Sequence, residues 1–243
     1  MSPRRMFIPI SGVSLRGLLA AALVALVLAL AVLVAPAQAA DQDPATKAKL
    51  ADLIKNLGDK NAEIRKQAAK SLGDMGPEAK EAVPALIKAL VDPSVDVRGG
   101  AAVALGRIGR GAMDIIPVLI ESLGNRDARV RQGAAIALGQ IGSEAKDAVP
   151  ALIKAFRDPE VSVRSWTASA LGQIGPEAKD SVPALIKALS APDADVRMDA
   201  ARSLGQIGPD AKQAIPDLER LAGKDPDETV RQSARDALEK IRK

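Results

Sequence analysis

Six arginines recur at one position of a repeating pattern and form the most regular charged feature of the sequence. The first five are 33 residues apart, and the sixth follows after one inserted residue. They are Arg65, Arg98, Arg131, Arg164, Arg197 and Arg231. A guanidinium group stays charged and binds a carboxylate or a phosphate through two parallel hydrogen bonds, so this arginine column could bind anions.

A structural role is the alternative for the arginine column, and we favour it. Each arginine could bond an acid or a carbonyl group at the turn of a neighbouring repeat. One turn position holds Asn125 and Ala191 in two repeats and an acid in three others. These acids are Asp59, Asp92 and Asp158. Because charges fixed at one position of a stacked array usually set its register, we expect a structural ladder.

A second group of candidate residues lies at positions that vary between the repeats. Val103, Ile136 and Trp166, the only tryptophan, form an apolar centre with Gln, Arg and Asp around it. Such a patch is typical of a protein-binding or peptide-binding groove, and Trp is enriched at binding hot spots. The alternative is that Trp166 fills space over Gly133 in the adjacent repeat. The candidate partner-binding residues are Val103, Arg107, Ile136, Gln140, Trp166, Ser169, Gln173, Asp199 and Arg202.

The composition leaves little for catalysis. The 243 residues include no His, Cys or Tyr, which excludes an imidazole base, a histidine metal ligand, a Ser–His triad and a thiolate nucleophile. Glu144, Glu160 and Glu177 fall in loops and are typical of a solvated surface. Glycine recurs at helix ends and never forms a phosphate-binding loop after a strand. The sequence therefore predicts a protein that is not an enzyme and has no catalytic residues, cofactor or metal.

The charge balance argues against a nucleic acid partner. Lys and Arg number 34 and Asp and Glu number 30, but Arg4, Arg5 and Arg16 lie in the first forty residues, which contain no acid. The remainder carries 31 basic against 30 acidic residues. Binding nucleic acid needs a basic face and aromatic side chains on which bases stack, and aromatic residues make up only 1% of this chain.

The first forty residues have the features of an export signal. Arg4 and Arg5 precede an apolar run at 18–35, and Ala37-Gln38-Ala39 follows. This order predicts a signal peptide at residues 1–39, cleaved after Ala39. The paired arginines also resemble a twin-arginine signal, so the choice between the Sec and twin-arginine routes stays open.

The alternative is an uncleaved N-terminal membrane anchor, because residues 18–35 could just span a hydrocarbon core of ~30 Å. In both cases the rest of the chain is exported. We expect it to be periplasmic or extracellular if cleaved and anchored to the inner membrane if not, with membrane contact only through this segment.

The elements that position the candidate residues repeat with the same period. Five prolines are 33 residues apart, at Pro84, Pro117, Pro150, Pro183 and Pro216. A period in this range is the signature of a stacked repeat protein. After a polar lead-in at 40–49, we expect an array over 50–243 with more polar capping repeats at both ends.

Each repeat is predicted to contain two helices. The first begins with proline in its first turn, and an Asp-Pro pair often ends it. The second buries one stripe of residues, which in the second repeat is Val97, Ala101, Leu105 and Ile108. A glycine closes it, at Gly109, Gly142, Gly175 and Gly208, and predicts a left-handed C-cap. The expected fold is all-α, a right-handed α-solenoid of about six two-helix repeats with the second helices lining one surface.

The repeated pattern VPALIKAL-x-DP-x-x-x-VR-x-x-AA-x-ALG-x-IG resembles the HEAT repeat, in the short form named after phycobilisome lyases. The resemblance covers residues 50–243 and implies a binding scaffold, since folds of this kind host many roles. A minority of such proteins are bilin lyases. One branch is an iron-dependent hydroxylase whose paired His-Glu ligands are missing here.

The combined hypothesis is an exported, non-catalytic scaffold that binds a protein or peptide on the surface of the second helices. One alternative is an enzyme or chaperone similar to the bilin lyases. Another is a purely structural spacer tethered to the membrane. The identity of the partner, the curvature of the array and its oligomeric state stay open.

Overall fold

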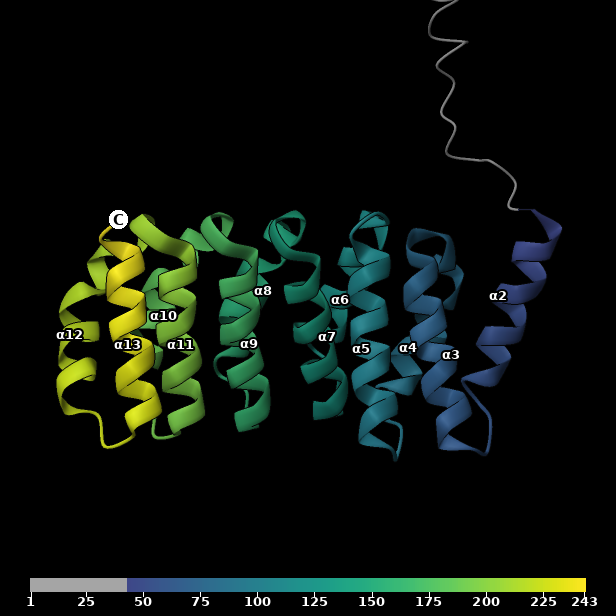
Figure 1. The fold of residues 1–243 in the computed structure, drawn as a ribbon, viewed down its shortest axis with the longest axis horizontal. Coiled ribbons are helices and arrows are strands. Elements are labelled where there is room, and N and C mark those ends of the chain that lie inside the picture. The colour runs from purple at the N-terminus through teal and green to yellow at the C-terminus, as the bar shows by residue number, and fades with distance from the viewer. Residues whose placement is uncertain (1–42) are drawn as a thin grey trace, which may run out of the picture. The chain divides into compact units, whose positions relative to one another are not determined.

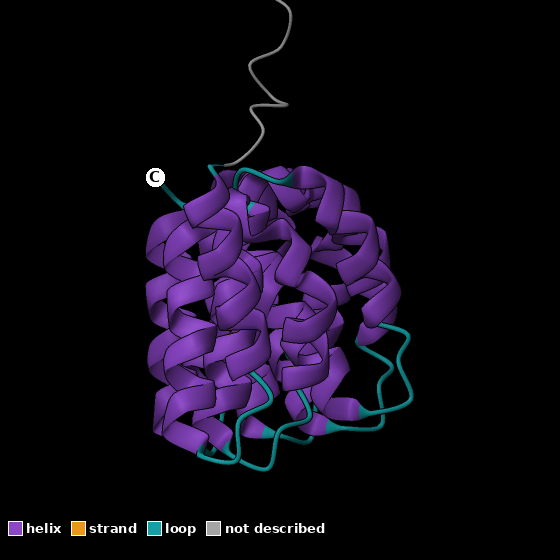
Figure 2. Cartoon of the chain, turned by 90° about the vertical axis from the view of Figure 1, so that its right-hand side faces the viewer, coloured by secondary structure: helices purple, strands orange, loops and turns teal. Residues whose placement is uncertain are grey.

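The computed structural model describes residues 43–243, and all regular structure in that part of the chain is helical (Figures 1 and 2). The predicted signal peptide or anchor at 1–39 and the start of the lead-in at 40–49 lie outside these residues. Among the helices at 43–243, none combines the length and apolar character needed to cross a bilayer.

Twelve α-helices alternate between two layers within residues 43–243. The first helices of the repeats are α2 (Pro44–Asn56), α4 (Val83–Ala89), α6 (Ile116–Ser122), α8 (Val149–Ala155), α10 (Val182–Ala188) and α12 (Ile215–Lys224). The second helices are α3 (Ala62–Met75), α5 (Val95–Gly109), α7 (Ala128–Ile141), α9 (Val161–Ile174), α11 (Ala194–Ile207) and α13 (Glu228–Ile241). Short 3-10 segments precede five of the first helices, at η1 (Gly76–Ala82), η2 (Met113–Ile115), η3 (Gly142–Ala148), η4 (Gly175–Ser181) and η5 (Gly208–Ala214).

The prediction of an α-solenoid built from six helix pairs is confirmed. Each second helix packs against the second helix of the next repeat and against the first helix of its own, and Figure 1 shows the second helices side by side from α3 to α13. The helix α2 begins at Pro44, inside the polar segment 40–49, so the first repeat starts earlier than the spacing of its apolar residues indicates.

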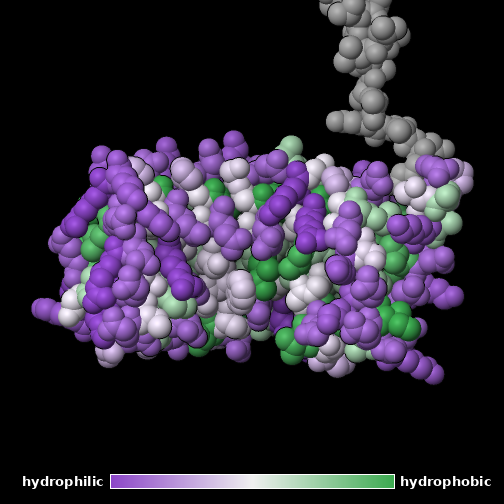
Figure 3. Space-filling view, viewed as in Figure 1, coloured by the Kyte–Doolittle hydropathy of each residue, from purple (hydrophilic) through white to green (hydrophobic). Residues whose placement is uncertain are grey.

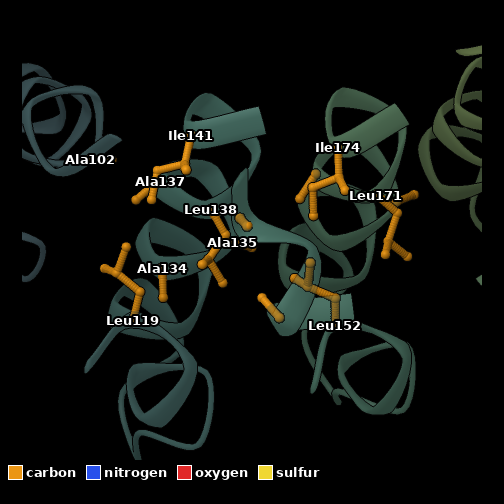
Figure 4. Close-up of a cluster of buried hydrophobic side chains, with 14 of the residues drawn as sticks. Ala102, Leu119, Ala134, Ala135, Ala137, Leu138, Ile141, Leu152, Leu171 and Ile174 are labelled. Carbon is orange, nitrogen blue, oxygen red and sulfur yellow. The ribbon is translucent and has the colours of Figure 1, made fainter. Parts of the chain in front are cut away.

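The core lies between the two layers and runs through all the repeats. The four residues of the predicted stripe on α5 are completely buried, as are Leu138 on α7 and Leu171 on α9. Figure 4 shows these two leucines with Leu119 and Leu152 from the first helices α6 and α8. Because burying one such side chain stabilises a fold by about 1.5–3 kcal/mol, each repeat depends on its neighbours for most of its stability.

Three of the four predicted glycine caps have positive φ, but their conformation is not the left-handed helical one. Gly142, Gly175 and Gly208 have φ of 80°, 76° and 77°, with ψ of −142°, −142° and −140°. This region is open almost only to glycine. Gly76, which follows α3, has φ of 60° as well.

The prediction of a left-handed cap at Gly109 is wrong. Gly109 is the last residue of α5, its φ is not positive, and the right-handed Arg110 follows it. A Cβ atom at Gly109 would lie 2.4 Å from the Cδ1 atom of Ile141. The side chain of Ile141 occupies this space, so a larger residue at Gly109 would have to displace it.

Replacing Gly175 by Ala should lower the free energy of unfolding by about 1–3 kcal/mol, because residues other than glycine are strained at this φ and ψ. An added Cβ would meet no atom within 4 Å, so the loss would come from the backbone alone. The control is Gly99→Ala, in the interior of α5 with equally open space, which should gain up to about 1 kcal/mol. Urea unfolding of the full chain measures both, and equal effects would contradict this explanation.

Candidate functional site: the surface of the second helices

The arginine column bridges consecutive repeats through carboxylates. Arg131 on α7 donates from Nε to Asp158 Oδ2 at 2.6 Å and from Nη2 to Oδ1 at 2.8 Å. Its Nη1 donates to the carbonyl oxygens of Asn125 and Arg126, in the turn before α7. The two charged side chains are only 12% and 7% exposed, so one guanidinium ties its own turn to the turn of the next repeat.

The same bidentate pair recurs twice more. Arg65 donates from Nε and Nη2 to the Asp92 carboxylate, both at 2.7 Å. Arg197 donates from the same two atoms to the Asp225 carboxylate, at 2.7 and 2.9 Å. The hydrogen bonds from Arg65 hold the pKa of Asp92 below its ordinary value, so the charged pair is the favoured state of the folded chain. The sequence reading missed Asp225, because the inserted residue shifts it out of the 33-residue register.

The other three arginines adjust to the residue at the turn position. Arg98 faces the repeat with Asn125 and bonds only the carbonyl oxygens of Asp92 and Pro93. Arg164 faces the repeat with Ala191 and reaches Asp193 instead, at 2.7 Å. Arg231 bonds the carbonyl oxygen of Asp225 and the carboxylate of Glu228.

All six guanidinium groups are thus engaged by this chain. That favours the structural interpretation over an anion-binding ladder.

The nine candidate partner-binding residues lie on four neighbouring helices, α5, α7, α9 and α11. Val103 is 36% exposed and Trp166 is 39% exposed, whereas Ile136 is only partly exposed. Arg107, Gln173 and Arg202 are exposed, and the others are half-buried; these are Gln140, Ser169 and Asp199. The structure therefore places all nine on one continuous layer.

The space over Gly133 belongs to Leu90. Gly133 is buried, and a Cβ atom there would lie 2.5 Å from the Cδ2 atom of Leu90, at the end of α4. The alternative that Trp166 fills this space is therefore wrong. Gly133 and Trp166 hold the same position in adjacent repeats, but Gly133 is buried and Trp166 is 39% exposed.

Apart from Arg129 and the column arginines Arg131 and Arg164, which are bonded at the turns, α7 and α9 present outward residues without formal charge, and we name these residues the uncharged band. They are Gln132, Ile136, Gln140, Ser162, Ser165, Trp166, Ser169 and Gln173. Charged side chains flank them on α5 and α11, and Figure 3 shows pale and green surface near the middle of this face with more purple toward the C-terminal end. The sequence analysis missed Gln132, Ser162 and Ser165, although each stands four residues before a candidate on the same helix face.

The carboxyl group of Asp199 is partly desolvated at this surface. Its side chain is 16% exposed, it accepts a hydrogen bond from Ser165 Oγ, and Arg202 Nη1 lies 4.0 Å from its Oδ1 atom. Burial raises the pKa of Asp199, although the Ser165 hydrogen bond and Arg202 oppose the shift. In the turns, by contrast, the arginines provide short bidentate partners for the buried carboxylates.

Comparison with known families and structures finds HEAT repeats over most of the chain. Matches to this family cover residues 24–97, 48–112, 83–172 and 149–239. Among curated proteins, none matches this chain.

The similar solved structures are repeat proteins of related architecture. An engineered protein is 29% identical over 80% of this chain and 96% of its own, with a TM-score of 0.55. A chain from the complex of CpcE and CpcF of phycocyanin lyase from Nostoc sp. PCC7120 is 30% identical, over 85% of this chain and 80% of its own, with a TM-score of 0.51. A designed armadillo repeat protein, 21% identical over 79% of this chain and 99% of its own at a TM-score of 0.51, shows the fold alone.

Replacing Arg131 by Met should cost about 3 kcal/mol of stability, because it leaves the buried carboxylate of Asp158 without its partner. The matched control is Arg98→Met, which removes hydrogen bonds to two carbonyls but leaves no carboxylate behind, and should cost about 1.5 kcal/mol. Urea unfolding at neutral pH compares the two, and a loss at Arg98 as large as that at Arg131 would contradict the bridging role.

Replacing Asp199 by Asn should raise the unfolding midpoint at pH 7. Because the folded-state pKa of Asp199 is raised, the folded chain binds this proton more tightly than the unfolded chain does. The protonated carboxyl group therefore costs no stability at low pH, and the wild type loses stability as the pH rises through the folded-state pKa. The gain of the Asn variant should therefore disappear near pH 3, where the wild-type carboxyl group is protonated in both states. Unfolding curves at the two pH values test this, and a variant less stable at pH 7 would refute it.

Proposed function

Because the chain belongs to the family of HEAT repeat proteins, we propose that it is a non-catalytic scaffold that binds a protein or peptide partner on the surface of its second helices. Scaffolds of this family typically mediate protein interactions. The observation that carries the proposal is the uncharged band, in a chain of which 26% of the residues are charged.

The uncharged band suits an interface because covering it with a partner removes no charge from water. Desolvating an ionised side chain costs far more than desolvating an apolar one, and the cores of interfaces are depleted of charged residues for this reason. Ile136 and Trp166 supply apolar area. Trp166 is exposed, and tryptophan is enriched at the hot spots of protein interfaces. The amide and hydroxyl groups around them can bond the backbone of a partner.

The charged residues on α5 and α11 would form the rim of this interface. Arg107 lies on one side of the band, and Asp199 and Arg202 lie on the other. Burial raises the pKa of Asp199 at the edge of the band, and a cation from a partner would offset the desolvation of its carboxylate. Residues that reduce the stability of a fold are expected at functional sites.

A role like that of a chromophore lyase is the second candidate, favoured by the similarity to a chain of the phycocyanin lyase complex. It requires a bound tetrapyrrole. A visible absorbance band on the purified protein would support this candidate, and a colourless protein that still binds a polypeptide would support the scaffold.

We also propose that the scaffold works outside the cytoplasm. This rests on residues 1–39 alone, whose basic start, apolar run and Ala-Gln-Ala end favour export. The intact mass of the mature chain distinguishes cleavage after Ala39 from retention of an anchor. A mature chain found in the cytoplasm would contradict both forms of the proposal.

The double variant Trp166→Ala with Ile136→Glu should lose the partner with little loss of helicity, because it removes the largest exposed side chain of the uncharged band and places a charge at its centre. The full chain would serve as bait in affinity capture from the cell envelope, with mass spectrometry to identify the bound protein. Calorimetry with that purified protein should then show at least a tenfold rise in Kd for the double variant.

The matched control is Val118→Glu on α6. Val118 is 40% exposed, close to the exposure of Trp166, but lies in the layer of the first helices. This control should bind as the wild type does. Equal binding by the double variant would move the site away from the uncharged band, and loss of binding by the control would show that any added charge disturbs the array.

A further inference from the structure

A recess with a volume of about 560 Å³ opens on the same surface between α3 and α5, outside the uncharged band. Its lining includes the small residues Ala69 and Gly73 from α3 and Gly99, Gly100 and Ala104 from α5. The apolar side chains of Val95 and Val103 stand beside it, 69% and 36% exposed. A surface hollow with an apolar floor is suited to receive a side chain from another molecule.

The recess exists because the second repeat has glycine at two consecutive positions, Gly99 and Gly100, and the first of these bears a side chain in the other repeats. A Cβ atom at Gly99 would meet no atom within 4 Å, so nothing in the fold requires glycine there. The equivalent residues in other repeats are Lys66, Gln132, Ser165 and Met198. Glycine in a helix interior is less favourable than Ala, so the open space is kept at the expense of stability.

Two ion pairs cross from α3 to α5 along the recess. Lys66 bonds Asp96 at 3.0 Å near the start of the two helices, and Arg107 bonds Asp74 near their ends. The recess is open between these two ion pairs. They also leave one lining cation, Lys70, without a carboxylate partner among the ion pairs of residues 43–243.

The charges of the lining therefore complement an acidic partner. Three cations and one carboxylate line the recess, and after the two ion pairs the ammonium group of Lys70 remains beside the apolar floor. A carboxylate next to an apolar anchor would gain a charge-assisted contact there, whereas a cation would meet Lys70 with a like charge.

We propose that this recess binds the large aliphatic or aromatic side chain of an extended peptide, with an Asp or Glu beside that anchor paired to Lys70. The inference rests on the proposed function, since the recess opens on the surface of the second helices. It adds the chemistry of the bound segment, which the uncharged band does not specify.

The test uses a random library of twelve-residue peptides displayed on phage and selected on the full chain. Enriched peptides, synthesised with a fluorescent label, are then titrated by fluorescence polarisation. We expect an aliphatic or aromatic residue next to Asp or Glu in the enriched set. The variant Gly99→Leu fills the recess, improves the helix propensity of α5, and should raise Kd at least tenfold.

Two further variants serve as control and charge test. Gly223→Leu on α12 adds the same side chain at another open glycine and should leave Kd within twofold of the wild type. Lys70→Glu should weaken the enriched peptides at least threefold, and selection on this variant should favour Lys or Arg beside the anchor. Circular dichroism confirms that each variant is folded.

The possible results separate this inference from the proposed function. Peptides that bind Gly99→Leu as tightly as the wild type, or an enriched set without acids, would overturn the recess as the binding site. If those peptides still lose affinity with the Trp166 and Ile136 double variant, the scaffold proposal stands without the recess. Binding that depends on Gly99 but not on the double variant would keep the recess and overturn the siting at the uncharged band. Failure to enrich any peptide would overturn the recess proposal, while capture of a protein decides the scaffold function separately.

Discussion

The close approach of consecutive second helices is the constraint on which the rest of the structure depends. One small position on each of these helices faces the backbone of the next, at Gly73, Gly106, Gly139, Gly172 and Gly205. A Cβ atom at Gly139 would lie 3.0 Å from the Cα atom of Ala170, and one at Gly205 would lie 2.8 Å from that of Ala237. Contacts this short leave no room for a side chain, so the sequence must repeat glycine here for the helices to stack.

The arginine column depends on that stacking and in turn fixes it. A guanidinium can join two turns only if the next repeat presents its carboxylate at a constant distance, which the packed helices provide. Where the carboxylate is missing, Arg98 keeps its carbonyl partners and Arg164 bonds Asp193, two residues after the turn position. The arginine can therefore pair with acids at different positions in the next turn, whereas the glycine between two stacked helices cannot be replaced by a larger residue.

The fold could be predicted from the sequence because the 33-residue period, the prolines that begin the first helices and the buried stripe of the second helices all follow from the stacking of the repeats. Details that depend on a single neighbour could not. Gly109 has the same place in the repeat as Gly142, but its φ is not positive, and Ile141 occupies the space beside it. Gly133 stands in line with Trp166 but lies under Leu90. The period gives a residue's position on its helix, but not which side chain from another repeat covers that position.

The same reasoning explains where specificity can reside in such an array. Positions that face the core or the next helix are fixed by packing, so they hold Leu, Ala or Gly in nearly every repeat. Positions that face solvent have no such requirement, and a departure there has to be explained by something outside the stack. Gly99 removes a side chain that the helix would benefit from, and Asp199 retains a charge that burial opposes. Both lie on the surface of the second helices, and both reduce stability without any gain in packing. Selection for folding alone would not keep either one, whereas a ligand that fills the recess or pairs with the carboxylate would offset these costs.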